Sequence, residues 1–252
     1  MTQPTSVAVL GASGRMGTEA VKAIDAAADL RLVAALGRTD SLEDIVTAGA
    51  QVIVDLTVPE STEHNVAFAV EHGIHAVVGT TGWDEERIGR LEGLLDRNRH
   101  VGVLIAPNFA LGSVLATAFA ARAARYFESV ELIELHHPDK VDAPSGTAER
   151  TAALIADARR EAGLAASPDA TRTARDGARG CDVDGVRVHS VRLRGLVAHQ
   201  EVLFGGVGEQ LTIRHDSFHR ESFMPGVLLG VREVSSRPGL TVGLDGYLDL
   251  QA

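Results

Sequence analysis

The sequence contains one cysteine and few aromatic residues. Cys181 is the only cysteine in 252 residues, which excludes an intramolecular disulfide and a zinc site built from cysteines. A single cysteine also fits a reducing compartment, so we expect a cytoplasmic protein. Aromatic residues make up 4% of the chain and hydrophobic residues 45%, which predicts substantial cores built mainly from Ala, Val, Leu and Ile.

Long apolar runs and an excess of positive charge are also missing. No run approaches membrane-spanning length, and the N-terminus leads into a predicted strand rather than a signal peptide. The formal net charge is −10, which argues against nucleic acid and anionic membranes as main partners. An anionic ligand would therefore need a local basic pocket. We expect no metal site.

Lysine is scarce, and one of the few lysines lies in an unusual stretch. Lys22 and Lys140 are the only lysines, and every other basic residue is arginine. Lys140 follows the adjacent histidines His136 and His137 within residues 134–147. A desolvated lysine can release a proton near neutral pH, whereas arginine cannot. Each residue alone is better explained as a solvated or structural side chain, but the cluster indicates a site for proton transfer.

The segments around this cluster predict a loop that binds an anion. A strand is predicted over residues 130–135 and a helix from 147 to about 162, while Pro138 and Pro144 keep the loop irregular. Ser145, followed four residues later by Glu149, is close to a helix-start signal. The free N–H groups and positive dipole end of a helix start suit a carboxylate or phosphate.

A glycine-rich loop follows the first predicted strand. Residues 6–10 form an apolar strand candidate, residues 11–17 read G-x-x-G-x-x-G, and a helix is predicted from 18 to 28. Such glycines allow a tight turn and let a pyrophosphate approach the helix N-terminus. The motif alone is weak evidence, but its place between strand and helix predicts a site for NADPH or NADH. The residues assigned to the pyrophosphate are Gly11, Ala12, Ser13, Gly14, Arg15 and Met16.

The end of the second predicted strand, residues 30–36, lacks an expected residue. Dinucleotide folds usually place Asp or Glu there to bind the ribose hydroxyls. Here Gly37 stands at the strand tip and Arg38 follows. Glycine does not repel a 2′-phosphate, and Arg38 or Arg15 can pair with one. We therefore expect NADPH to be used at least as well as NADH.

Strands and helices alternate through residue 106. Helices are predicted over 41–49, 61–71 and 84–97, and strands over 51–56, 75–82 and 101–106. The nearly continuous apolar strands predict a parallel sheet covered on both faces. Ligands bind at the carboxyl ends of such strands, which indicates two further binding segments. Their residues are Gly79, Thr80, Thr81, Ala106, Pro107, Asn108 and Phe109.

The second half of the chain changes character. After helix 111–127, residues 163–180 predict a surface loop, and strands over 186–193, 196–204 and 210–216 are expected to be antiparallel because short turns join them. A helix over 223–234 and an apolar tail, 240–250, are expected to return to the first domain. The edges of an open sheet favour self-association.

These patterns predict an α/β protein of two domains. Residues 1–108 and 218–252 are expected to form a Rossmann-like, parallel-sheet nucleotide domain. Residues 109–217 are expected to form an α+β domain for substrate binding and tetramerisation, with a mostly antiparallel open sheet.

Six segments, spread in order over essentially the whole chain, carry a family resemblance. They are GASGRMG (11–17), VGTTG (78–82), APNF (106–109), ELHHPDK (134–140), DAPSGTA (142–148) and LDL (248–250). With them the sequence resembles the 4-hydroxy-tetrahydrodipicolinate reductase (dihydrodipicolinate reductase) family. The fourth and fifth segments are the specific pair, whereas the glycine loop alone is not. Gly37 departs from the pattern, because many members carry Asp or Glu there.

The resemblance implies NADPH- or NADH-dependent reduction of 4-hydroxy-tetrahydrodipicolinate in diaminopimelate and lysine biosynthesis. Hydride would go to C4 of the ring and a proton to the neighbouring carbon, and the 4-hydroxyl would leave as water. His136 would be the general acid and Lys140 its partner. Residues 79–81 and 106–109 would line the nicotinamide side. The resemblance also implies a homotetramer joined through the antiparallel sheets. The cyclic dicarboxylate would contact His137, Lys140, Ser145, Gly146, Thr147 and Arg220.

Two other functions are compatible with the same two-domain plan. One is a different NAD(P)-dependent reductase or an amino-acid dehydrogenase, which substrate-specific turnover would distinguish. The other is a nucleotide-sensing module without catalysis, which would bind NADPH tightly and turn nothing over. The sensing module gives no reason for the His-His-x-x-Lys loop, and the fold alone does not decide among the three.

Overall fold

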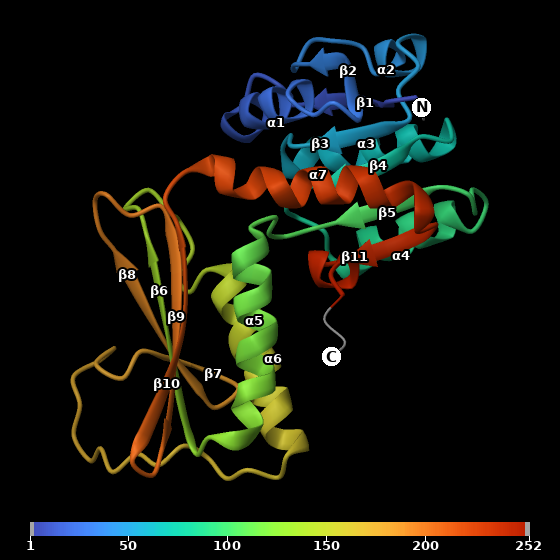
Figure 1. Ribbon diagram of the computed structural model, residues 1–252. Coiled ribbons are helices and arrows are strands. Elements are labelled where there is room, and N and C mark those ends of the chain that lie inside the picture. Colours follow the sequence, from blue (N-terminus) through green and yellow to red (C-terminus); the bar gives the residue numbers. More distant parts are fainter. Residues whose placement is uncertain (1–2, 250–252) are drawn as a thin grey trace. The chain divides into compact units, whose positions relative to one another are not determined.

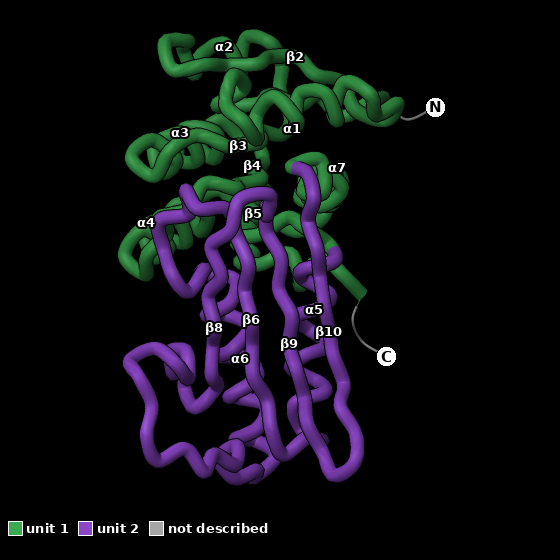
Figure 2. Tube along the Cα trace, turned by 90° about the vertical axis from the view of Figure 1, so that its left-hand side faces the viewer, with its two compact units in different colours: residues 1–111, 220–252 green, residues 112–219 purple. Residues whose placement is uncertain are grey.

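The computed structural model describes residues 3–249, and the chain divides into two compact units (Figure 2). Unit 1 comprises residues 1–111 and 220–252, and unit 2 comprises residues 112–219. The first unit is thus completed by the C-terminal part of the chain. Among the described helices, none is long and apolar enough to cross a membrane.

Unit 1 is built on sheet A, a parallel sheet of six strands. The strands are β1 (Thr5–Leu10), β2 (Leu30–Leu36), β3 (Val52–Asp55), β4 (His75–Val78), β5 (Gly102–Ile105) and β11 (Gly239–Val242). Their order is β11-β5-β4-β3-β1-β2, with every neighbouring pair parallel. The predicted parallel sheet is therefore confirmed. From β1 the chain passes first to β2 on one side and then to β3 on the other, which opens a ligand crevice at the carboxyl ends of these strands.

Helices cover both faces of sheet A (Figure 1). They are α1 (Arg15–Asp25), α2 (Glu43–Thr47), α3 (Pro59–Glu71), α4 (Glu85–Leu95) and α7 (Met224–Glu233). Helix α1 packs beside α7, and α3 packs beside α4. Each predicted helix is present with shifted ends. Helix α3 begins before the predicted residue 61 because Pro59 fits its first turn.

The C-terminal tail forms more structure than its apolar pattern predicts. Residues 239–242 form β11, which lies parallel to β5 and extends sheet A. The following 3-10 turn, η4 (Leu244–Tyr247), buries Leu244 and Tyr247. Residue 250, the predicted end of this tail, lies outside the described residues.

Unit 2 contains two long helices and sheet B. Its elements are α5 (Leu111–Ala123), β6 (Ser129–His136), α6 (Gly146–Glu161), β7 (Cys181–Val183), β8 (Val186–Arg192), β9 (Ala198–Gly206) and β10 (Glu209–Ser217). The sheet order is β10-β9-β6-β8-β7. Strands β9 and β10 are an antiparallel pair, as predicted. Strands β8 and β9 also run in opposite directions, but they are not neighbours, because β6 lies between them.

The unexpected place of β8 follows from its connection to β6. These two strands are parallel, and parallel neighbours need a long crossover rather than a short turn. Helix α6 and the loop over residues 163–180 provide that crossover. The turn between β8 and β9 is short, but it passes over β6 instead of forming a hairpin.

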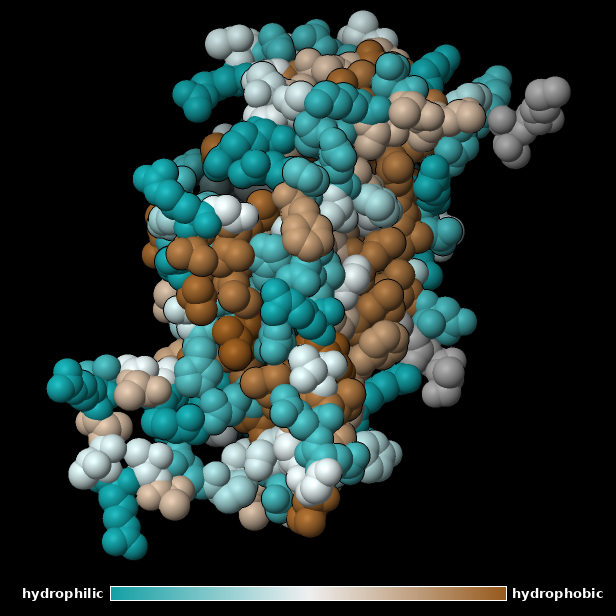
Figure 3. Space-filling view, turned by 60° about the vertical axis from the view of Figure 1, so that its left-hand side comes forward, coloured by the Kyte–Doolittle hydropathy of each residue, from teal (hydrophilic) through white to brown (hydrophobic). Residues whose placement is uncertain are grey.

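One face of sheet B forms the core of unit 2. Val130, Leu132, Val202 and Phe204 are buried against residues of α5 and α6 such as Ile155. Successive strand residues point to opposite faces, so Ile133, Leu135 and Leu203 lie on the other face, where they are only half-buried. In Figure 3, which brings the side of sheet B forward, hydrophobic residues lie among hydrophilic ones on the surface. The prediction of an open, mostly antiparallel sheet is confirmed.

Candidate active site

The glycine loop in unit 1 connects β1 to α1 and requires its glycines. Gly11 has a φ of 76°, and a Cβ on it would lie 2.6 Å from the carbonyl oxygen of Leu56. A Cβ on Gly17 would lie 2.1 Å from the carbonyl oxygen of Gly11. Gly14 is the N-cap of α1, without a side-chain cap, and the first turn of that helix carries no acidic residue. The loop thus presents uncapped N–H groups at a helix N-terminus, which suits a pyrophosphate.

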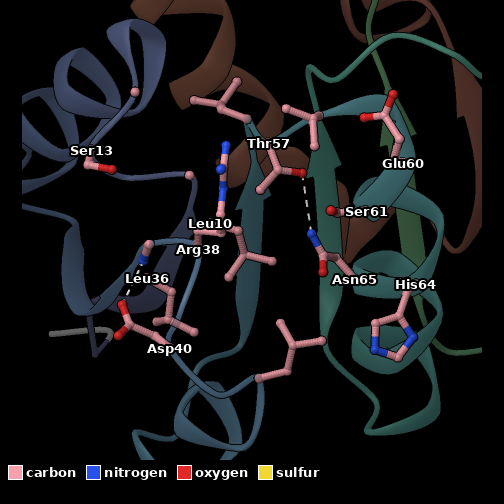
Figure 4. Close-up of a pocket in the computed structure, with 16 residues that line it drawn as sticks. Leu10, Ser13, Leu36, Arg38, Asp40, Thr57, Glu60, Ser61, His64 and Asn65 are labelled. Atoms are coloured by element: carbon pink, nitrogen blue, oxygen red, sulfur yellow. Dashed lines mark hydrogen bonds between the residues drawn. The ribbon is translucent and has the colours of Figure 1, made fainter.

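A cavity of about 730 Å³ opens beside this loop. Ser13 and Asp40 line it from the side of the glycine loop and β2, while Thr57, His64 and Asn65 line it from the side of β3 and α3 (Figure 4). The lining also includes Gly11, Gly14, Gly37 and Arg38, but not Ala12, Arg15 or Met16. Its size, the glycine cradle and the backbone donors fit the adenosine and phosphate part of a dinucleotide.

A carboxylate lies near the tip of β2 although Gly37 has none. Asp40 Oδ2 accepts a hydrogen bond of 2.7 Å from the backbone N–H of Gly37. A Cβ built on Gly37 would lie 3.6 Å from the same oxygen. Asp40 and Arg38 therefore bring opposite charges to one wall of the cavity.

The segments after β4 and β5 come together in unit 1. A Cβ on Gly79 would lie 2.9 Å from the ring of Phe109, so the two predicted binding segments pack against each other. Phe109 is buried, and the N–H of Ala110 donates to Asn108 Oδ1 at 2.9 Å. Thr81 and Pro107 are exposed beside them.

A buried carboxylate fixes this end of sheet A. Asp55 is fully buried at the end of β3. It accepts hydrogen bonds from the hydroxyls of Thr57 at 2.6 Å and Thr80 at 2.8 Å. It also accepts from the amide of Asn65 at 3.0 Å. The strand exits after β3 and β4 are thereby held in one hydrogen-bond network.

In unit 2, the predicted helix start is confirmed. Ser145 is the N-cap of α6, and its hydroxyl accepts the N–H of Ala148 at 3.2 Å. Ser145 is buried, while Gly146 is exposed and has nothing within 4 Å of a built Cβ. The Asp142 carboxylate accepts the N–H of Gly146, so the start of α6 already holds an anionic group, as a helix N-terminus favours.

His136 ends β6 and contacts the carboxylate two residues before it. Its Nδ1 is hydrogen-bonded to Oε2 of Glu134, which is fully buried. Burial lowers the pKa of the His136 imidazole; Glu134 acts in the opposite direction, and the nearby Lys140 and Arg192 cations lower it further. The net shift of the pKa is downward from the usual value, which favours the neutral ring in the free chain.

Lys140 lies on the loop that follows His136. Its ammonium donates to Asp142 Oδ1 at 2.5 Å, and the backbone N–H of Lys140 donates to the carbonyl of His137 at 3.2 Å. That ammonium lowers the pKa of the Asp142 carboxyl, and burial only partly offsets the effect. His136, Lys140 and the start of α6 thus belong to one loop of unit 2. Arg220 lies in unit 1, in the 3-10 turn η2 (Arg220–Phe223).

Four residues with a clear structural role here were not predicted from the sequence. Glu134 contacts both His136 and Arg192, and Arg192 also contacts the loop that follows His136. Asp40 contacts Gly37, and Asp55 organises the strand exits. Glu134 and Asp55 did carry a signal, since each is an acidic residue inside an apolar strand. Within residues 3–249, no group of three or more His, Cys, Asp or Glu side chains is arranged to hold a metal ion.

Comparison with protein families covers nearly the whole chain. Residues 5–109 match the family described as "Dihydrodipicolinate reductase, N-terminus". Residues 112–248 match the family described as "Dihydrodipicolinate reductase, C-terminus". The two matches meet close to the boundary between the two compact units, at residues 111 and 112.

Full-length relatives and solved structures agree with these matches. A 4-hydroxy-tetrahydrodipicolinate reductase of Streptomyces griseus is 67% identical over 244 residues, which is 97% of this chain and 98% of the relative. The corresponding protein of Nocardia farcinica is 64% identical with the same coverage. A structure titled "Dipicolinate bound Dihydrodipicolinate reductase" from Paenisporosarcina sp. TG-14 superposes with a TM-score of 0.88 and 38% identity, over 98% of this chain and 100% of that one. A probable dehydrogenase from Thermotoga maritima, with a TM-score of 0.64 and 10% identity over 96% of this chain and 92% of that one, shares the fold alone.

Proposed function

The chain belongs to the dihydrodipicolinate reductase family, and we propose that His136 and Lys140 carry out the proton transfer of its reaction. It is an NAD(P)H-dependent oxidoreductase that reduces 4-hydroxy-tetrahydrodipicolinate in diaminopimelate and lysine biosynthesis. The observation that carries the proposed roles is the pairing of the His136 imidazole with the buried Glu134 carboxylate at the end of β6, on the strand that leads into the loop before α6.

Unit 1 supplies the cofactor-binding residues in this proposal. When bound, NADPH or NADH supplies the hydride. Gly11 to Met16 surround the pyrophosphate with backbone N–H groups, and the cavity beside them takes the adenosine. Gly79 to Thr81 and Ala106 to Phe109 line the nicotinamide side. The packing of Phe109 against Gly79 and the Asp55 network support this assignment, since they hold both segments rigid.

Unit 2 supplies the residues that bind the cyclic dicarboxylate. One carboxylate accepts the N–H groups of Gly146 and Thr147 and the hydroxyl of Ser145, and it displaces the Asp142 carboxylate, which accepts the Gly146 N–H in the free chain. Lys140 pairs with a carboxylate and is released from Asp142 as it does so. His137 is a further contact from unit 2, and Arg220, which belongs to unit 1, is the remaining contact in the proposal. The open space beside Gly146 supports a ligand at this position.

His136 donates the proton that completes the reduction. In the free chain, burial lowers the pKa of the imidazole and so favours its neutral form. A dianionic substrate nearby stabilises the imidazolium and raises that pKa, so the ring becomes protonated as the substrate binds. His136 is then charged only when its proton is needed. Lys140 assists as a second proton donor.

The cofactor preference follows from the wall of the cavity. Gly37 stands where many family members carry an acid and leaves room for a 2′-phosphate, and the next residue, Arg38, supplies a positive charge. We infer that NADPH is used at least as well as NADH. Asp40 opposes this preference in part, because its carboxylate lines the same cavity.

The open face of sheet B supports a homotetramer. Half-buried apolar side chains such as Leu135 and Leu203 lie on the face that α5 and α6 leave uncovered. The outer strands β10 and β7 also present edges that a second copy can cover. The single cysteine and the biosynthetic reaction support a cytoplasmic location.

The activity itself is tested by the loss of NADPH absorbance with freshly generated substrate. A coupled synthase supplies 4-hydroxy-tetrahydrodipicolinate, and we expect turnover that depends on both the synthase and this chain. An amino-acid dehydrogenase would instead oxidise NADPH with 2-oxo acids and ammonia, and a sensing module would bind NADPH without turnover. Either of these results would contradict the proposed function.

A further inference from the structure

A fully buried carboxylate lies next to the proposed general acid and is held by an arginine from a distant strand. Glu134 Oε1 accepts Arg192 Nη2 at 2.8 Å, and Glu134 Oε2 accepts Arg192 Nη1 at 2.9 Å. This is a two-point ion pair in the interior of unit 2. A charge buried in this way is costly unless it is paired and fully hydrogen-bonded. Arg192 supplies both the charge and the two hydrogen bonds that this carboxylate needs.

The strand register brings these side chains together. In the parallel pair β6–β8, His136 lies opposite Arg192 and Glu134 lies opposite Ser190. Glu134 and His136 are two residues apart on one strand, so both point to the same face. The side chain of Arg192 reaches across from the neighbouring strand to the carboxylate of Glu134. The contact thus depends on β8 lying directly beside β6.

The contact with Glu134 sets the tautomer of His136. An ionised carboxylate only accepts hydrogen bonds, so Nδ1 of His136 carries the proton that Oε2 accepts. Nε2 is then the free nitrogen of the neutral ring and the atom that gains and gives up a proton. Burial alone would raise the pKa of Glu134, but hydrogen bonds from Arg192, Ser190 and His136 outweigh it and lower that pKa. Glu134 therefore stays ionised and keeps the tautomer fixed.

The same arginine also holds the loop that carries Lys140. Arg192 Nη2 donates to the carbonyl oxygen of Asp142 at 2.7 Å, and the side chain of Asp142 accepts from Lys140. One guanidinium thus holds Glu134, which orients His136, and the backbone next to Lys140.

We propose that Glu134 and Arg192 are positioning residues of the reductase, which present Nε2 of His136 and the Lys140 loop to the substrate. The inference rests on the proposed role of His136. Neither residue touches substrate or cofactor in this account. Glu134 acts through the imidazole, and Arg192 acts through Glu134 and the carbonyl of Asp142.

The test compares Glu134→Gln, Glu134→Asp, Arg192→Gln and Arg192→Lys with the wild type. Glutamine keeps the size of Glu134 but loses its charge, and lysine keeps the charge of Arg192 but loses the two-point contact. The readouts are kcat, KM for the dicarboxylate, the dissociation constant of NADPH, the pH profile of kcat/KM and thermal unfolding. Glu131→Gln is the matched control, because Glu131 lies on the same strand and also contacts a histidine and an arginine, His189 and Arg179.

For Glu134→Gln we expect kcat to fall roughly 100-fold, as misplacement of a reacting group does, with the NADPH dissociation constant unchanged. The part of the kcat/KM pH profile that reports the titration of His136 should move to lower pH. Arg192 and Lys140 lower the pKa of His136, and the carboxylate that opposes them is then missing. Glu134→Asp should recover part of the activity. Arg192→Lys should lose less kcat than Arg192→Gln, and both should raise KM. Glu131→Gln should match the wild type in every readout except stability.

A purely structural role would lower stability without moving the pH limb. The inference is overturned if folded Glu134→Gln keeps the wild-type pH limb and kcat while His136→Ala is inactive. It is also overturned if Glu131→Gln loses as much kcat as Glu134→Gln. Full activity of His136→Ala would instead contradict the proposed role of His136, and this variant is measured separately for that reason.

Discussion

Asp40 accepts the backbone N–H of Gly37 at 2.7 Å, so the carboxylate missing from the tip of β2 is supplied from three residues further along the chain. It lines the same cavity as Arg38. We therefore expect cofactor choice in this chain to depend on the balance between the Arg38 cation and the Asp40 carboxylate, rather than on the single acid usual at a strand tip.

The balance between Arg38 and Asp40 predicts how substitutions shift the ratio of kcat/KM for NADPH and NADH. Gly37→Asp adds a second carboxylate next to Asp40 and should shift the ratio of kcat/KM toward NADH by roughly 10-fold, about 1.4 kcal/mol. Arg38→Ala should lower kcat/KM for NADPH and leave kcat/KM for NADH almost unchanged, whereas Asp40→Asn should shift the ratio toward NADPH. Arg97→Ala, an exposed change beyond the end of α4, is the control. A wild type that strongly prefers NADH, or an Arg38→Ala variant that weakens both cofactors equally, would refute this account.

Binding of a cyclic dicarboxylate should take up a proton. Burial lowers the pKa of His136 in the free chain, and a bound dianion raises it. Affinity should therefore rise as the pH falls through the interval between the raised and the lowered pKa, and level off below it. Calorimetry with pyridine-2,6-dicarboxylate, in buffers of different ionisation enthalpy at about pH 6 to 8, measures the uptake. His136→Gln should abolish it, and uptake that persists in this variant would assign the proton to another group.

The Asp55 network should matter more for stability than an exposed carboxylate does. Asp55→Ala leaves the buried donors of Thr57, Asn65 and Thr80 without their acceptor, which should cost roughly 3 kcal/mol. Asp84→Ala removes only the N-cap of α4, where Asp84 accepts from the N–H of Arg87, and should cost about 1 kcal/mol. Urea unfolding of both variants compares them. Equal losses would mean that the Asp55 network does not hold the strand exits.

The oligomeric state tests the role of the open face of sheet B. Light scattering at micromolar concentration should give the mass of a homotetramer. Leu203→Arg places a charge among half-buried apolar residues on that face and should lower the mass, while Val207→Arg, in an exposed turn, should not. A monomeric wild type would contradict the proposed assembly.

Local patterns were enough to predict much of unit 1 and the loop of unit 2 that carries the proposed catalytic residues. The apolar strands, the helix starts and the glycine loop depend on neighbouring residues, and Ser145 could be identified as a helix start from its own surroundings. The His136 and Lys140 cluster was recognisable because both residues lie within one short loop.

The contacts that complete the site could not be predicted in this way. Arg192 meets Glu134 only because β8 pairs with β6 in one particular register, and the short turn before β9 suggested a different neighbour. Asp40 substitutes for the missing acid through the local path of the chain after Gly37. β11 was missed because a strand of four residues gains its hydrogen bonds from β5 rather than from its own sequence.

The most direct test of the central claim is the turnover of His136→Ala and Lys140→Ala with freshly generated 4-hydroxy-tetrahydrodipicolinate. Each variant should lose roughly 100-fold or more in kcat, as removal of a general acid does. The NADPH dissociation constant should stay close to that of the wild type, because the proposed cofactor residues lie in unit 1 and both substituted residues lie in unit 2. A His136→Ala variant that keeps wild-type turnover would contradict the assignment of His136 as the proton donor.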